Sequence, residues 1–136
     1  MNRRGHIKTL TASIALGYLL AAPALAQETI KVGVLHSLSG TMAISETVLK
    51  DTVLMAIDEI NAKGGVLGKK LEPVVVDPAS NWPLFAEKAK QLITQDKVVT
   101  IFGGWTPSNR REMKTVVEKY DHLLVFPSRD EGMEDS

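Results

Sequence analysis

Residues 98–113, VVTIFGGWTPSNRREM, contain the pattern that decides the fold. The apolar run from Val98 to Phe102 stops at two glycines, which are followed by a tryptophan, by small hydroxyl residues and by the start of a helical pattern. In open parallel sheets, ligands bind beyond the carboxyl ends of the strands, where such a loop leads into the next helix. The stretch therefore predicts a buried strand, a loop that faces a ligand, and an amphipathic helix.

Short apolar strands and amphipathic helices alternate along the rest of the chain. We expect strands over residues 29–36, 71–76, 98–102 and 123–126. We expect helices from Ser45 to a stop at Gly64-Gly65, from about Pro83, and from a cap at Ser108 or Asn109. The expected core faces of these helices are Leu49, Val53, Ala56, Ile57 and Ile60; Phe85, Ala89, Leu92 and Ile93; and Met113, Val116, Val117 and Tyr120. This order predicts an α/β fold, a parallel sheet with helices on both faces. Pro73 suggests either that the second strand lies at an edge of the sheet or that its pairing starts late.

The first 26 residues have the pattern of a cleaved signal peptide. Arg3, Arg4 and Lys8 precede an apolar stretch over residues 9–20, and Ala24-Leu25-Ala26 provides a small-x-small cleavage site. The alternative, a membrane anchor, requires about 20 apolar residues, and this stretch is shorter. Arg3-Arg4 also resembles a twin-arginine motif, so the general secretory route and the twin-arginine route both stay open.

The composition limits the kinds of partner and chemistry. The chain has 136 residues with 16 basic and 16 acidic side chains, which gives no electrostatic reason to expect a nucleic acid or an anionic membrane as partner. Because there is no cysteine, no disulfide or lipoprotein anchor is expected, and we predict a free protein in the periplasm. The sequence has no dinucleotide or P-loop fingerprint, no nucleophile elbow and no metal-spaced histidine cluster. We therefore expect no enzyme activity, no cofactor and no metal.

The predicted carboxyl ends of the strands carry hydroxyls, backbone amides and tryptophans. These groups suit a small polar ligand that is largely neutral. We expect Trp105, directly after Gly103-Gly104, to face the ligand, because glycines let the backbone approach a partner closely. Trp82 has two open interpretations, a ligand contact or a contact that fixes the start of the next helix. We expect His36 and His122 to be structural or solvated.

Four segments carry a resemblance to a known family. They are IKVGVLHSLSGTMAISE (residues 30–46), AIDEINAKGGVLGKKLEPVVVDPASNWPLFAEKA (56–89), FGGWT (102–106) and FPSRDEG (126–132). Together they resemble the substrate-binding proteins of branched-chain-amino-acid-type ABC transporters, with the urea-transport and amide-binding members most similar. The resemblance implies the first lobe of a type 1 periplasmic binding protein over residues 27–136, incomplete at its end. It also implies capture of urea or a short-chain amide for an ABC permease in the inner membrane. The alternatives are an aliphatic (branched-chain) amino acid-binding protein and a non-functional truncated remnant.

The same resemblance implies which residues contact the ligand. In the family, the first lobe contributes the loops after its first, third and fourth strands. Residue by residue, this gives Ser37, Ser39, Gly40, Trp105, Thr106, Phe126 and Ser128. Trp105 and Phe126 would form aromatic walls. The urea members usually have a ligand-binding serine where this chain has Pro107, so Ser108 is the expected substitute.

Overall fold

The computed structural model of the protein describes residues 28–128. The predicted signal peptide, residues 1–26, and the residues from 129 onward lie outside this described range. The elements are β1 (Thr29–Leu35), α1 (Ala43–Ala62), β2 (Lys70–Val76), α2 (Trp82–Gln91), the π-helical turn η1 (Leu92–Asp96), β3 (Ile101–Gly103), α3 (Pro107–Lys119) and β4 (Leu124–Val125).

The four strands form one parallel sheet in the order β2-β1-β3-β4. In its centre, Val34 of β1 is in register with Val75 of β2 and with Phe102 of β3. The predicted parallel sheet is confirmed. Of the two alternatives for Pro73, the edge position is confirmed, since β2 is an outer strand and Pro73 is exposed there. The late start is wrong, because β2 already pairs with β1 from Lys70.

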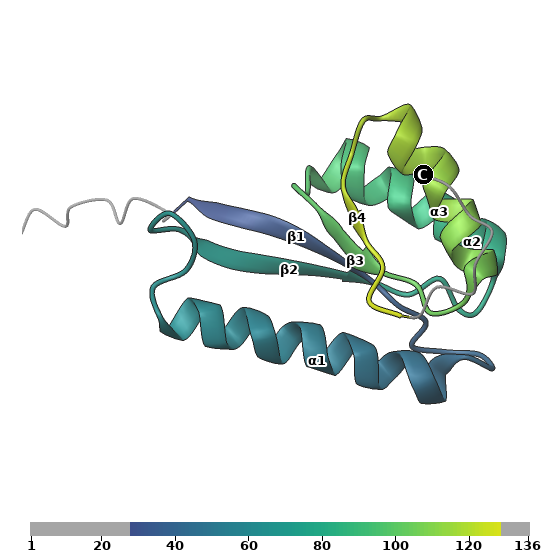
Figure 1. Ribbon diagram of the computed structural model, residues 1–136, viewed down its shortest axis with the longest axis horizontal. Helices are drawn as coiled ribbons and strands as arrows, with labels where there is room; N and C mark the ends of the chain where they lie inside the picture. Colours follow the sequence, from purple (N-terminus) through teal and green to yellow (C-terminus); the bar gives the residue numbers. More distant parts are fainter. Residues whose placement is uncertain (1–27, 129–136) are drawn as a thin grey trace, which may run out of the picture.

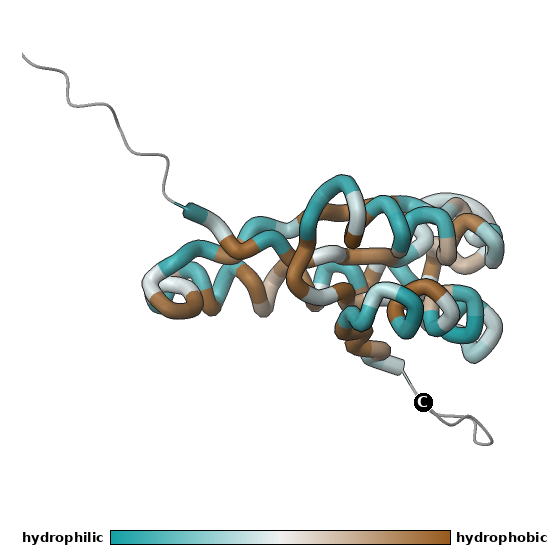
Figure 2. Tube along the Cα trace, turned by 90° about the horizontal axis from the view of Figure 1, so that it is seen from above, coloured by the Kyte–Doolittle hydropathy of each residue, from teal (hydrophilic) through white to brown (hydrophobic). Residues whose placement is uncertain are grey.

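Helices cover both faces of the sheet, as the sequence predicts (Figure 1). On one face, α1 packs Ile57 against Val32 and Val34 of β1. On the other face, α2 and α3 enclose the larger part of the core. Its buried members are Leu35, Met42, Phe85, Ala89, Leu92, Val98, Ile101, Met113 and Val117. Hydrophobic stretches of the trace accordingly run through the middle of the molecule (Figure 2).

The α1 face is packed less tightly than predicted. Of the five residues expected on its core face, only Ile57 is buried, with 4% of its surface exposed, and Ile60 keeps 37%. An apolar hollow of about 200 Å³ lies beside them, lined by residues of α1 and of the sheet that include Val53, Ala56 and Phe102. Among the described residues, no helix is both long enough and apolar enough to cross a membrane.

The third strand begins later than predicted, at Ile101 instead of Val98. Lys97 adopts a left-handed backbone (φ 59°) that ends the preceding helical turn. Val98 then packs into the core, while Val99 is 58% exposed. The Val99 N–H donates to the Lys31 carbonyl at 2.9 Å, so the segment already runs beside β1 before regular pairing starts.

Candidate ligand-binding site

The loops that follow the strands meet at one end of the sheet. Because all four strands are parallel, the loops after β1, β2, β3 and β4 lie at its carboxyl edge (Figure 1). This is the edge at which open parallel sheets bind ligands. Every residue predicted to contact a ligand lies in one of these loops or, for Ser108, in the first turn of α3.

The loops after β1 and β2 are joined by the carboxylate of Asp77. It accepts hydrogen bonds from the Leu38 N–H at 2.9 Å, the Ser39 hydroxyl at 2.7 Å and the Ala79 N–H at 2.7 Å. Burial raises the pKa of the Asp77 carboxyl, but the bonds from the Ser39 hydroxyl and from neighbouring backbone N–H groups outweigh burial and hold that pKa below its ordinary value. Ser39, a predicted ligand residue, therefore already uses its hydroxyl proton within the protein.

Ser80 adds a second set of bonds between the same loops. Its hydroxyl accepts from the Met42 N–H at 2.9 Å and donates to the Ser39 carbonyl at 2.8 Å, and its N–H donates to the Ser37 hydroxyl at 3.1 Å. Ser80 itself has a left-handed backbone (φ 58°). Gly40 lies against it: a Cβ at Gly40 would fall 2.6 Å from Ser80 Oγ. The close approach of the two loops therefore requires glycine at position 40.

The loop after β3 is organised by Asn109. Its side-chain oxygen accepts from the Trp105 N–H at 3.2 Å and the Thr106 N–H at 3.1 Å, while the Thr106 hydroxyl accepts from the Asn109 N–H at 3.4 Å. This is a capping box with Thr106 as the N-cap and a proline in the first turn. The prediction that Ser108 or Asn109 caps this helix is therefore wrong. Ser108 lies half-buried in the first turn, and Asn109 supplies the reciprocal half of the box.

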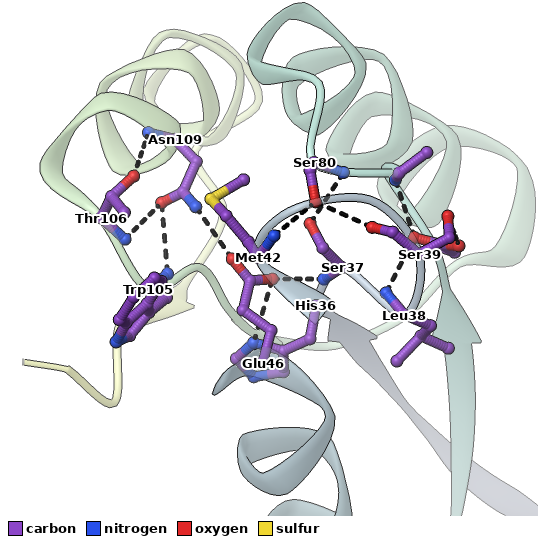
Figure 3. Close-up of polar contacts among 12 residues, drawn as sticks. His36, Ser37, Leu38, Ser39, Met42, Glu46, Ser80, Trp105, Thr106 and Asn109 are labelled. Atoms are coloured by element: carbon purple, nitrogen blue, oxygen red, sulfur yellow. Dashed lines mark hydrogen bonds and ion pairs between the residues drawn. The ribbon is translucent and has the colours of Figure 1, made fainter. Parts of the chain in front are cut away.

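A buried glutamate links the two halves of the edge (Figure 3). Glu46, in the first turn of α1, has no exposed surface. One carboxylate oxygen accepts from the Ser37 N–H, and the other accepts from Asn109 Nδ2 at 3.3 Å. His36 is also fully buried, with Nδ1 3.8 Å from Glu46 Oε2, and within the described residues neither ring nitrogen makes a hydrogen bond. Of the two roles expected for His36, structural or solvated, its burial agrees with the structural one.

The aromatic residues differ in exposure. Trp105 is 38% exposed at the carboxyl edge, and Phe126 is half-buried with the Arg110 guanidinium 4.8 Å from the centre of its ring. Trp82 is 52% exposed at the start of α2, whose N-cap is Asn81, so both interpretations of Trp82 stay open. Ser128, the last described residue, is half-buried.

The structure thus brings most predicted site residues together. Ser37 connects to Trp105 and Thr106 through Glu46 and Asn109. Ser39 and Gly40 lie against Ser80, which also bonds to Ser37. Phe126 lies beside Gly104, the residue before Trp105: a Cβ at Gly104 would fall 2.8 Å from Phe126 Cε2.

Four polar residues that organise this edge were not among the predicted site residues, although Asn109 was a predicted helix cap. They are Glu46, Asp77, Ser80 and Asn109. The run Asp77-Pro78-Ala79-Ser80-Asn81 did carry a usable signal, since Asp and Ser side chains in turns bind nearby backbone amides. Within residues 28–128, no group of three or more His, Asp or Glu side chains could hold a metal ion.

Comparisons with known proteins give a consistent result. A family model described as a periplasmic binding protein domain matches residues 30–136. The chain is 36% identical over 114 residues to Leu/Ile/Val-binding protein homolog 7 of Brucella melitensis biotype 1, which covers 84% of this chain and 28% of the relative. It is 30% identical over 123 residues to the leucine-, isoleucine-, valine-, threonine- and alanine-binding protein of Pseudomonas aeruginosa, over 90% of this chain and 32% of that one.

The solved structure of a substrate-binding protein also matches this chain. The branched-chain amino acid transporter substrate binding protein LivJ from Streptococcus pneumoniae, in complex with isoleucine, matches with a TM-score of 0.74 and 32% identity. The match covers 77% of this chain and 30% of LivJ. The chain therefore spans about a third or less of the length of each of these three proteins.

Proposed function

Because this chain belongs to the family of periplasmic binding protein domains, we propose that the protein is the exported solute-binding component of an ABC transporter. In this proposal it captures an aliphatic amino acid in the periplasm and delivers it to a permease in the inner membrane. The observation that carries the proposal is the match of residues 30–136 to the family, together with relatives named for binding leucine, isoleucine and valine.

From the sequence alone, urea or a short-chain amide was the first prediction and an aliphatic amino acid the second. The names of the relatives support the second of these, and the LivJ structure contains isoleucine. The order of the two ligand classes is therefore reversed in our proposal.

We propose that the ligand lies against the carboxyl edge of the sheet. The contacting residues would be Ser37, Ser39, Gly40, Trp105, Thr106, Ser108, Phe126 and Ser128. Trp105, at 38% exposure, offers an aromatic surface for an aliphatic side chain. The Thr106 hydroxyl accepts one bond as the helix cap and keeps its own proton for a ligand oxygen.

One observation keeps urea or a short-chain amide as a second candidate. An amino acid carries a carboxylate, which is bound best by N–H donors or by a cation. Several N–H groups of this edge already have acceptors inside the protein: those of Leu38 and Ala79 at Asp77, and that of Trp105 at Asn109. A neutral ligand has no carboxylate charge that such donors would have to match.

Calorimetric titration of the full-length protein separates the candidates. We expect binding of L-leucine, L-isoleucine and L-valine, with D-leucine as a stereochemical control that binds more weakly. Binding of urea and acetamide without binding of the amino acids would replace the first candidate by the second. If none of these ligands binds, the proposed capture function is wrong.

A further inference from the structure

We propose that Glu46 is a positioning residue of the ligand site: its buried carboxylate holds the loop after β1 and the start of α3 at a fixed separation. This inference rests on the proposed function in one respect, since it treats the two loops as walls of one site. The residue touches no ligand in this proposal. It acts through Ser37 on one side and through Asn109 on the other.

The geometry provides a continuous path between the two loops (Figure 3). From one oxygen of Glu46 the path leads to the Ser37 N–H, in the loop after β1. From the other oxygen it leads over 3.3 Å to Asn109 Nδ2, which lies 63 positions away in the sequence. The Asn109 oxygen then accepts from the N–H groups of Trp105 at 3.2 Å and Thr106 at 3.1 Å. Two side chains thus connect the backbones of both proposed ligand loops.

A carboxylate suits this position because it can accept on both oxygens. Both of these partners are N–H donors, so a glutamine would have to direct its own NH₂ group at one of them. A buried carboxylate also costs free energy unless it is hydrogen-bonded. An apolar residue at position 46 would avoid this cost but could not link the two loops.

A purely structural role makes a different prediction from a positioning role. If Glu46 only stabilises the fold, its replacement lowers the melting temperature and leaves the folded protein with normal affinity. If it positions the loops, affinity falls in protein that is still folded, and the amides at both ends of the path lose protection from exchange.

The matched pair of variants is Glu46→Gln and Ile57→Ala, both buried positions of α1 in the full-length protein. Ile57 packs in the apolar cluster on the α1 face with Val32 and Val34 and takes part in none of the hydrogen bonds that form the path. We expect Glu46→Gln to weaken binding of the ligand found in the calorimetric titration about ten-fold, the size of one lost buried hydrogen bond. We also expect faster hydrogen exchange at the Ser37 and Trp105 amides. Ile57→Ala should lower the melting temperature but leave the affinity and these two amides unchanged.

A second variant, Asn109→Asp, tests the link from its other end and covers the case in which Glu46→Gln does not fold. It keeps an oxygen for the Trp105 and Thr106 amides but replaces the donor that faces Glu46 by an acceptor. We expect the same loss of affinity and faster exchange at Ser37.

Folded Glu46→Gln or Asn109→Asp protein with wild-type affinity and exchange would overturn the inference, as would an equal loss of affinity in Ile57→Ala. If the wild-type protein binds no ligand, the proposed function fails, and the exchange experiment still decides whether Glu46 links the loops.

Discussion

At the scale of single residues, Gly104 connects the core to the proposed site. Its backbone is left-handed (φ 83°), and a Cβ there would lie 2.7 Å from Met113 Cε and 2.8 Å from Phe126 Cε2. Met113 is fully buried, and Phe126 is a proposed wall of the site. The absence of a side chain at position 104 therefore lets a core residue of α3 and an aromatic after β4 pack against the same backbone.

Gly104→Ala and Gly68→Ala form a matched pair that separates backbone strain from crowding. Gly68 has a similar backbone (φ 77°), but a Cβ there would meet nothing within 4 Å. We expect Gly68→Ala to cost about 1–2 kcal/mol of unfolding free energy from the left-handed conformation alone. Gly104→Ala should cost about 1–3 kcal/mol more, because Met113 and Phe126 must move. Urea denaturation measures the unfolding free energy of both variants. Equal losses in the two would contradict the crowding at Gly104.

Asp77, which lies at the same edge of the sheet, makes the stability of the folded protein depend on pH. Its folded-state pKa lies below its ordinary value, so the ionised form stabilises the fold. This contribution is complete above the unfolded-state pKa of about 3.9 and is lost as the pH falls through the lower folded-state pKa.

We therefore expect Asp77→Asn to lower the free energy of unfolding at pH 7, and the gap to wild type to shrink as the pH falls below about 4. Denaturant titrations at a series of pH values measure the gap. Asp58→Asn, at an exposed position of α1, is the control and should change stability by no more than about 0.5 kcal/mol. A gap that stays constant down to pH 2 would contradict the role of the Asp77 charge.

At the scale of elements, the start of α3 combines helix capping with the site. Thr106 caps the helix and also presents its hydroxyl at the carboxyl edge. The sequence pattern favoured Ser108 or Asn109 as the cap because both are good capping residues. Pro107 did carry a usable signal, because proline is common in the first turn directly after the cap; it indicates Thr106 as the cap, two residues before Ser108.

Thr106→Ala should therefore destabilise the protein by about 1 kcal/mol, the usual effect of removing an N-cap. Ser108→Ala, which removes the predicted cap, should change stability by less than about 0.5 kcal/mol. Thermal unfolding of the two variants side by side tests the assignment. A larger loss in Ser108→Ala than in Thr106→Ala would contradict it.

The elements themselves were predictable to different degrees. Of the core residues predicted for the second and third helices, five are buried: Phe85, Ala89, Leu92 (in the turn η1), Met113 and Val117. The other three, Ile93, Val116 and Tyr120, are half-buried. The α1 face was predicted less well, because only Ile57 of its five expected core residues is buried. Periodicity identifies the apolar side of a helix but does not show how closely the sheet approaches it.

At the scale of the whole molecule, the parallel sheet follows from the alternation of strands and helices together with right-handed connections. The hydrogen bonds that hold the site residues in place cannot be predicted from this alternation. Glu46 and Asn109 lie 63 positions apart, and their contact arises only when α1 and α3 are placed on opposite faces of the sheet. No local pattern in the sequence records such a contact.

The ligand class was the least predictable feature. The sequence alone predicted urea or a short-chain amide, whereas the compared relatives are named for binding leucine, isoleucine and valine. The chain covers 28–32% of the length of these relatives.

The central claim is that the loop after β3 faces the ligand, and tryptophan emission of the full-length protein tests it most directly. We predict that saturating ligand changes the emission of the wild-type protein and of Trp82→Phe, and that Trp105→Phe loses the change while calorimetry still detects binding. Phenylalanine keeps an aromatic surface at position 105, so the loss would report the position of the indole and not a loss of binding. An undiminished change in Trp105→Phe would contradict the account, because the ligand would then lie away from this loop.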